Sequence, residues 1–237
     1  MPETDEFRPE NRIGAVLVSS RSLDEYRRMF ALTDTDLAGR ILDCPGGAAS
    51  LTAEVNAAGG TATACDPVYE RPVEQVRETA LESLGRGYAY HQANPEEYVW
   101  TYFRDPDHYL ESRTRSVELF AADRAAHPRN YVPAALPTLP FEDGRFDLVL
   151  CSHLLFSYAD RFDREFHVAS LRELARVGRE VRVFPLVPMG MTENPELAPV
   201  RAELAAAGLP TTVRRVGYEF QRGGDAMLTI GVLPPPM

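Results

Sequence analysis

The sequence predicts an α/β fold in which helices cover both faces of a mainly parallel sheet. Short apolar strands alternate with helical segments over most of the chain, and this alternation is typical of a doubly wound sheet. Residues 146–151 are almost continuously apolar, as expected of a strand that is buried on both faces. The last two predicted strands, 211–216 and 227–233, have no helix between them, so we expect them to pair antiparallel.

The individual elements follow from capping residues and apolar spacing. Ser22 can cap a first helix after a lead-in over residues 1–20, and Gly59-Gly60 can end a later one. In chain order the predicted elements are helix 23–31, strand 40–43, helix 48–58, strand 61–65, helix 68–83, strand 146–151, helix 163–177, strand 180–184, helix 196–207, strand 211–216 and strand 227–233.

Residues 85–130 do not fit this alternation and are predicted to form an aromatic-rich insertion. Of the 22 aromatic residues in the chain, seven fall between positions 88 and 109. Two interpretations remain open, because aromatic clusters serve both purposes. The insertion is either a lid across a pocket or a helical hairpin whose aromatic side chains form ordinary core.

The basic residues are unusual, because all 25 are arginine and the chain contains no lysine. This excludes a Schiff-base lysine, a phosphate-loop lysine and a Tyr-x-x-x-Lys dehydrogenase dyad. The net charge of −10 argues against non-specific binding to nucleic acid or to an anionic membrane. It also makes an acidic or phosphorylated substrate less expected, and any such group would have to be held by arginine, histidine or backbone amides.

The termini and cysteines indicate a soluble, cytoplasmic chain. The acidic start, residues 1–6, does not resemble a signal peptide, and the apolar stretches are too short to span a bilayer. Cys44, Cys65 and Cys151 match no Cys-x-x-Cys pattern. We therefore expect reduced thiols and no metal site, and the oligomeric state is left open.

Chemically distinctive residues follow three of the predicted strands. They are Asp43 with the turn glycines Gly46 and Gly47, then Asp66, and then Ser152-His153. Ligands of a doubly wound sheet bind beyond the carboxyl ends of its strands, where these residues should meet. An acid at position 66 can accept hydrogen bonds from both hydroxyls of a ribose, which predicts an adenosine-type ligand.

The turn after the first strand distinguishes between two such ligands. A dinucleotide requires Gly-x-Gly-x-x-Gly, whereas this turn reads Asp-Cys-Pro-Gly-Gly-Ala-Ala. The carboxylate of Asp43 would repel a pyrophosphate but would suit the cationic amino-acid end of S-adenosylmethionine. The charge therefore favours S-adenosylmethionine as the cofactor over a nicotinamide dinucleotide.

Three stretches of the chain resemble the class I S-adenosylmethionine-dependent methyltransferases, a Rossmann-like family. They are residues 40–50 (RILDCPGGAAS), 61–66 (TATACD) and 139–158 (LPFEDGRFDLVLCSHLLFSY). Their joint order and spacing extend the resemblance over most of residues 38–233. It implies a doubly wound, mainly parallel seven-stranded sheet with an antiparallel C-terminal strand and a helical insertion. The expected single domain covers residues 1–237, with the N-terminal lead-in and helix over 1–37 and the insertion or lid over 85–130.

The resemblance also implies roles for individual residues. Asp43, Gly46 and Gly47 would hold the methionine portion of the cofactor, and Asp66 would bind its ribose. Leu136 would lie beside the adenine, and Ser152 and His153 would border the methyl-donor pocket. The sequence departs from the family pattern at Pro45 and Ala49, which replace glycines, and it lacks the acid that often contacts the adenine amino group.

The function implied is methyl transfer from S-adenosylmethionine to a small-molecule acceptor. His153 is the candidate general base because histidine titrates near neutral pH; alternatively it contacts the cofactor or the sheet edge without catalysis. His91 and His108 are second candidates for binding the acceptor. Two other functions remain open, a non-catalytic protein that binds S-adenosylmethionine or S-adenosylhomocysteine and, less favoured, a nucleotide-dependent oxidoreductase.

Overall fold

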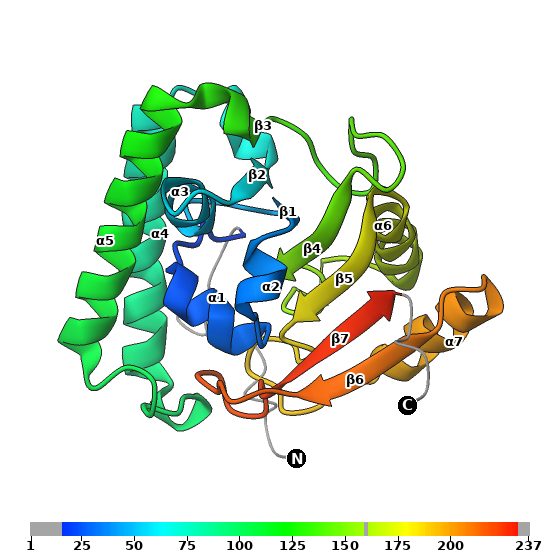
Figure 1. Cartoon of the computed structure of the whole chain (residues 1–237). Coiled ribbons are helices and arrows are strands. Elements are labelled where there is room, and N and C mark those ends of the chain that lie inside the picture. Colours follow the sequence, from blue (N-terminus) through cyan, green and yellow to red (C-terminus); the bar gives the residue numbers. More distant parts are fainter. Residues whose placement is uncertain (1–15, 159–160, 232–237) are drawn as a thin grey trace, which may run out of the picture.

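The computed structural model describes residues 16–158 and 161–231, whose strands form one seven-stranded sheet (Figure 1). The strand order is β3-β2-β1-β4-β5-β7-β6, and only the pairings of β7 are antiparallel. The strands are β1 (Arg40–Asp43), β2 (Thr61–Cys65), β3 (Tyr131–Val132), β4 (Phe146–Ser152), β5 (Gly178–Phe184), β6 (Thr211–Arg215) and β7 (Ala226–Gly231). The predicted fold class, including the antiparallel closing pair, is confirmed.

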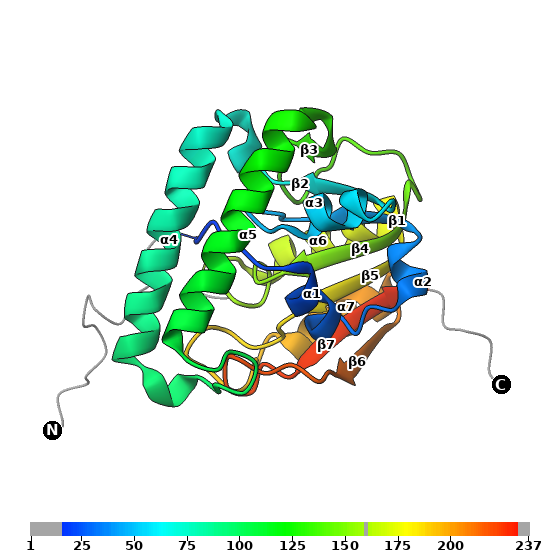
Figure 2. The same ribbon diagram turned by 60° about the vertical axis from the view of Figure 1, so that its left-hand side comes forward.

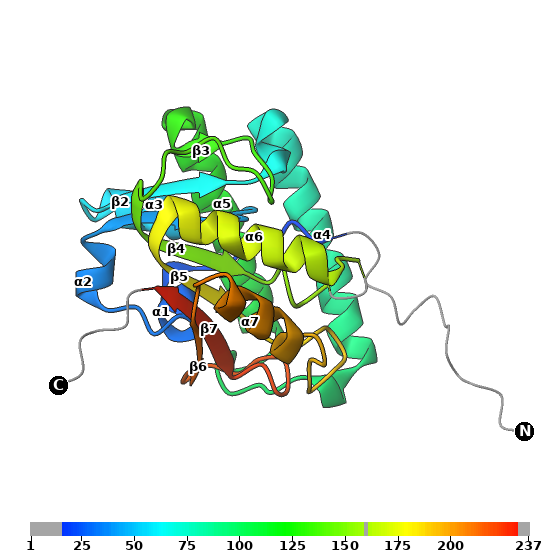
Figure 3. The same cartoon turned by 90° about the vertical axis from the view of Figure 1, so that its right-hand side faces the viewer.

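Helices cover both faces of the sheet. One face carries α1 (Leu23–Met29), α2 (Asp34–Leu37), α3 (Leu51–Ala57), α4 (Val73–Ala93) and α5 (Pro106–Ala126) (Figure 2). The other face carries α6 (Arg164–Val177) and α7 (Leu197–Ala206) (Figure 3). Successive side chains of a strand point to opposite faces, so Leu148 and Leu150 pack towards α1 and α3 while Val149 packs towards α6 and α7. The buried apolar strands therefore join two cores.

The parallel register brings the carboxyl ends of three strands to one edge. Asp43 at the end of β1 pairs with Ala64 of β2 on one side and Leu150 of β4 on the other. Asp66 and Ser152 each lie two residues beyond these partners. The rule for parallel sheets therefore holds, and the predicted site residues converge on this edge.

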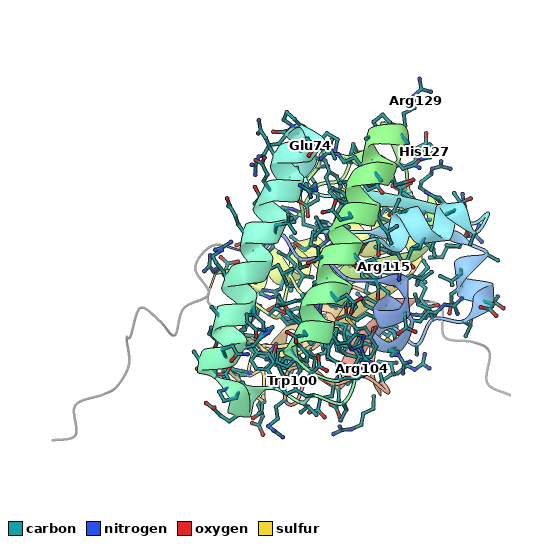
Figure 4. The ribbon with its side chains drawn as sticks, turned by 90° about the vertical axis from the view of Figure 1, so that its left-hand side faces the viewer. Glu74, Trp100, Arg104, Arg115, His127 and Arg129 are labelled. Atoms are coloured by element: carbon teal, nitrogen blue, oxygen red, sulfur yellow. The ribbon has the colours of Figure 1, made fainter. Side chains whose placement is uncertain are left out.

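The largest difference from the sequence prediction is the helical hairpin α4–α5. A 3₁₀ turn, Pro67–Glu70, precedes α4, which continues through Gly85 and Gly87 to Ala93, so position 85 is not a boundary. Glycine costs a helix about 1 kcal/mol relative to alanine, and packing along α5 offsets that cost. Figure 4 shows Trp100 and Arg104 at the connection between the helices and Glu74 and His127 at the opposite end.

Smaller differences have local causes. The helix predicted from residue 48 begins at Leu51, and residues 48–50 form a turn in which the N–H groups of Ala48 and Ser50 donate to the carbonyls of Ser19 and Arg21. The short elements α2 and β3 were not predicted, since four and two residues carry no periodic signal. The predicted end of the last strand, residues 232–233, and the lead-in over residues 1–15 lie outside the described residues. Within the described residues no helix is long and apolar enough to cross a membrane.

Candidate active site

A cavity of about 340 Å³ opens at the carboxyl ends of β1, β2 and β4, and we call it the strand-end cavity. Five of the seven residues predicted for the site line it: Gly47, Asp66, Leu136, Ser152 and His153. The other two, Asp43 and Gly46, do not line it. The segment at residues 16–19 also contributes to the wall.

Asp66 presents its carboxylate to the strand-end cavity in a fixed orientation. One carboxylate oxygen accepts a hydrogen bond from the N–H of Val68 (3.0 Å), and the other accepts from the N–H of Gly47 (2.9 Å). Burial raises the pKa of Asp66, and these two hydrogen bonds partly oppose that shift. Each carboxylate oxygen can accept a further hydrogen bond, so the group retains the capacity to bind two hydroxyls.

Much of the remaining wall of the strand-end cavity is apolar. Ala134, Ala135 and Leu136 form one part of it. Phe162 and Phe166 form another, with their rings stacked at 4.5 Å between centroids. A cavity with apolar walls and a single carboxylate suits the base and ribose of a nucleoside.

The two turn glycines are required by packing within the chain. At Gly46 a Cβ atom would lie 2.6 Å from the Tyr69 hydroxyl, closer than real Cβ contacts allow. Gly47 has φ +52°, and a Cβ there would lie 2.7 Å from the carbonyl oxygen of Ser19. The sequence prediction assigned both glycines to a sharp turn and to contact with the methionine portion of a cofactor. In the structure the groups that approach them are the Tyr69 hydroxyl and the Ser19 carbonyl.

Asp43 is buried behind the cavity instead of facing into it. Its side chain is 1% exposed, and both carboxylate oxygens accept from the hydroxyl of Tyr26, at 3.0 and 3.1 Å. Burial raises the pKa of Asp43 well above its usual value. This geometry does not favour direct contact with the methionine portion of a cofactor, and Asp43 instead anchors α1 to the end of β1.

His153 lies where the strand-end cavity meets a second cavity. Its backbone is in the left-handed region (φ +51°) and its N–H donates to the carbonyl of Phe184 (2.7 Å). Its Nδ1 is hydrogen-bonded to the hydroxyl of Ser152 (2.9 Å). Burial, reinforced by the charges of Arg21 and Arg113, lowers the pKa of His153 well below its usual value. The imidazole is therefore neutral at pH 7.

The second cavity, about 100 Å³ in volume, lies beneath the α4–α5 hairpin, and we call it the hairpin cavity. It shares four wall residues with the strand-end cavity, namely His153 and residues 17–19. Tyr98 and Tyr109 of the aromatic insertion line it, whereas Phe103 is fully buried in the core. The two interpretations of the insertion are thus both partly right, since it forms core and also covers a cavity.

The two second-rank histidines have different positions. His91 lies in the wall of the hairpin cavity, with its ring 4.2 Å from that of Tyr98 and 5.0 Å from that of Phe220. Burial, and after it the charges of Arg113 and Arg21, lower the pKa of His91 to about 3. His108 lies outside both cavities in the first turn of α5, where its Nδ1 accepts from the N–H of Arg104 (3.2 Å).

Sequence reasoning missed the two arginines of the hairpin cavity. Arg113 lies on the buried stripe of α5 that also contains Tyr109, Val117 and Phe120. Arginine is rarely fully buried without a partner, so a charged residue on an otherwise apolar helical stripe was the available signal. Arg21, in contrast, precedes the first helix and carries no such pattern.

The three cysteines are free thiols at the crowded strand ends. Cys44 and Cys65 line the strand-end cavity, and Cys151 is fully buried. A hydrogen bond with Cys65, together with burial, raises the pKa of Cys44, and burial raises the pKa of Cys151 to about 12. These two thiols are therefore protonated and unreactive at pH 7. The described residues contain no group of three side chains placed to hold a metal ion.

Comparison with known proteins gives one family and several similar chains. Residues 108–180 match the model of a methyltransferase domain. The uncharacterized protein MJ0045 of Methanocaldococcus jannaschii is 28% identical over 216 residues, which cover 89% of this chain and 93% of that protein.

Two solved structures of magnesium protoporphyrin IX methyltransferase (ChlM) from Synechocystis PCC 6803 are 15% identical to this chain. The structure with bound SAM has a TM-score of 0.41 and covers 88% of this chain and 90% of its own. The structure with bound SAH has a TM-score of 0.42, with coverage of 88% and 93%.

Proposed function

We propose that this chain, a class I S-adenosylmethionine-dependent methyltransferase, transfers the methyl group to a small-molecule acceptor bound in the hairpin cavity. The observation that carries the proposal is the meeting of two cavities at His153, one at the strand ends and one beneath α4 and α5. A donor and an acceptor held in adjoining cavities can be aligned for in-line displacement.

The residues of the strand-end cavity fit the cofactor. Asp66 is oriented to accept from the two ribose hydroxyls, because both of its oxygens are already fixed by backbone N–H groups. Leu136 and the neighbouring alanines would contact the adenine, and Ser152 and His153 would border the methyl donor. When bound, the cofactor supplies an electrophilic methyl group and departs as a neutral thioether that keeps the electron pair of the broken carbon–sulfur bond.

The chain itself orients the acceptor, excludes water and handles the proton. Leu17, Val18 and His153 line both cavities, where the donor and the acceptor would adjoin. His153 is neutral and can take the proton of an O–H or N–H acceptor as that group attacks. Its low pKa makes it a weak base, so proton transfer is favoured only late, when the attacking group has become acidic in the transition state.

A small acceptor agrees with the dimensions of the site and with the charge of the chain. The hairpin cavity has a volume of about 100 Å³ and lies beneath a helical hairpin. A net charge of −10 is unfavourable for nucleic acid. These observations support a small molecule over a macromolecular acceptor.

The proposal is tested in two steps. In calorimetric titrations we expect S-adenosylmethionine and S-adenosylhomocysteine to bind and NAD not to bind. Tight binding of NAD without any response to the other two ligands would overturn the proposal. In the second step, wild-type protein is incubated with S-adenosylmethionine and a metabolite extract, and release of S-adenosylhomocysteine is followed. Cofactor binding without turnover in any extract fraction would favour the non-catalytic binding protein.

A further inference from the structure

We propose that the acceptor carries a carboxylate or a phosphate, and that Arg21 binds this anionic group in the hairpin cavity. This inference rests on the proposed function, because it names the acceptor class for the same site. It reverses the expectation drawn from the net charge of the whole chain.

The first observation is the guanidinium of Arg21, which lines the hairpin cavity and has two buried nitrogens without a hydrogen-bond partner among the described residues. Its side chain is 12% exposed, and its Nε and Nη1 atoms are buried with no partner among the described residues. The nearest carboxylate oxygen, Oε1 of Glu25, lies 3.5 Å from Nε. A buried donor without a partner costs free energy that a ligand can recover.

The second observation is an excess of positive charge around the cavity. Oε1 of Glu25 already accepts from Nη2 of Arg113 (2.7 Å) and from the hydroxyl of Tyr218 (2.6 Å), whereas its Oε2 is buried without a hydrogen-bond partner among the described residues. Arg113 is itself only 3% exposed and also donates to the carbonyl of Ser20 (2.5 Å). Two buried guanidinium groups thus share the carboxylate of Glu25. The other carboxyl group that acts on Arg21 is that of Asp43, which is hydrogen-bonded to Tyr26 and whose pKa burial raises well above its usual value. The positive charge of the pair is therefore not fully compensated.

No other charged side chain of the cavity wall balances that charge. Besides Arg21 and Arg113, the titratable wall residues are histidines and tyrosines. Burial, with the two arginine charges adding to it, lowers the pKa of His91 and of His153, so both are neutral. An uncompensated buried charge is costly unless an opposite charge is supplied, and an anionic ligand would supply it.

The third observation is a pair of further polar atoms in the same wall that lack partners. They are Nδ1 of His91 and Oγ of Ser157, in side chains that are 8% and 6% exposed. The remaining wall includes the rings of Tyr98, Tyr109 and Phe220. The cavity therefore combines a cation, two unpaired polar atoms and aromatic surface, which fits a small anion that has a flat apolar body.

The test compares anionic and neutral probes of matched shape. Benzoate, phenyl phosphate and benzamide are titrated by calorimetry into wild-type protein saturated with S-adenosylhomocysteine. We expect benzoate or phenyl phosphate to bind at least about tenfold more tightly than benzamide, since a charge-assisted hydrogen bond exceeds a neutral one by roughly that factor. The stronger of the two anions identifies which group the acceptor carries.

Two variants locate the effect. R21Q should abolish the preference for the anion. R28Q, which changes an exposed arginine of α1 that pairs with Asp24, should retain it. If the substitution of the buried Arg21 prevents folding, the comparison of probes on wild-type protein still tests the proposal.

The two proposals fail in different ways. If S-adenosylhomocysteine does not bind, the proposed function is overturned. If it binds but neither anion is preferred over benzamide, or if a folded R21Q keeps the preference, only the acceptor class is overturned.

Discussion

The two cavities that meet at His153 have opposite electrostatic character. The strand-end cavity contains one carboxylate, Asp66, among apolar side chains at the ends of parallel strands. The hairpin cavity contains two guanidinium groups, on Arg21 and Arg113, and lies under helices added to the sheet. In the proposed function, the sheet edge would hold the cationic sulfonium cofactor and the hairpin cavity would select the acceptor.

The largest expected effect concerns His153, which lines both cavities. H153A should lower kcat by roughly 10²–10⁴-fold, the usual contribution of a general base, while affinity for S-adenosylhomocysteine is retained. Because the pKa of His153 is well below its usual value, its protonation should not appear as a limb of the wild-type pH–rate profile between pH 6 and 8. H108A, which changes a partly exposed residue outside both cavities, serves as the control. A loss of cofactor affinity with kcat intact would instead make His153 a cofactor contact.

The next largest effect concerns only the strand-end cavity. D66A should weaken binding of S-adenosylhomocysteine by roughly 1–3 kcal/mol, the cost of leaving buried hydrogen-bonding groups without a partner. D34N, at an exposed position of α2, should leave the calorimetric affinity unchanged. If D66A also leaves it unchanged, the ribose binds elsewhere.

A pH dependence of stability concerns the hairpin cavity. His91 has a pKa of about 3 in the folded protein but about 6.5 when unfolded. As the pH falls from about 6.5 towards 3, the unfolded chain takes up this proton first, so the free energy of unfolding decreases by up to about 1.4 kcal/mol per pH unit. Urea unfolding at several pH values should therefore show a shallower decrease for H91Q than for wild type. Equal slopes would contradict burial of a neutral His91.

The smallest effect concerns the exposed side of the hairpin. Arg77 of α4 and Glu118 of α5 form an ion pair with an Nη2–Oε1 distance of 2.6 Å, and both side chains are partly exposed. Exposed pairs contribute little and are screened by salt. E118Q should lower Tm by no more than about 2 °C at low salt, and the difference should vanish in 1 M NaCl. A larger shift would mean that the surface pair, and not the buried faces, holds α4 against α5.

Local sequence patterns predicted the sheet and five residues of the strand-end cavity. The bounds of β1 and β2 match the prediction residue for residue, because each strand follows a glycine and is ended by a turn sequence, Cys44-Pro45-Gly46-Gly47 after β1 and Asp66-Pro67 after β2. Asp66, Ser152 and His153 could be placed together because parallel strands end at one edge of a sheet. Placing these three residues together required only the order of the strands in the sheet.

The hairpin cavity could not be predicted in the same way. Arg21 and Arg113 are far apart in the sequence and meet only because α1 packs between the sheet and α5. The tyrosine that binds Asp43 is likewise supplied by α1. The charge of the whole chain, −10, conceals a local excess of positive charge, because most of the carboxylates that produce it lie elsewhere.

The central claim is that donor and acceptor occupy the strand-end and hairpin cavities and meet at His153. A crystal structure of the protein with S-adenosylhomocysteine tests it most directly. We predict ribose hydroxyls at the carboxylate of Asp66, adenine beside Leu136, and the sulfur atom directed towards His153 and the hairpin cavity. An adenosyl group bound beneath the α4–α5 hairpin, or a sulfur atom directed away from His153, would contradict this assignment.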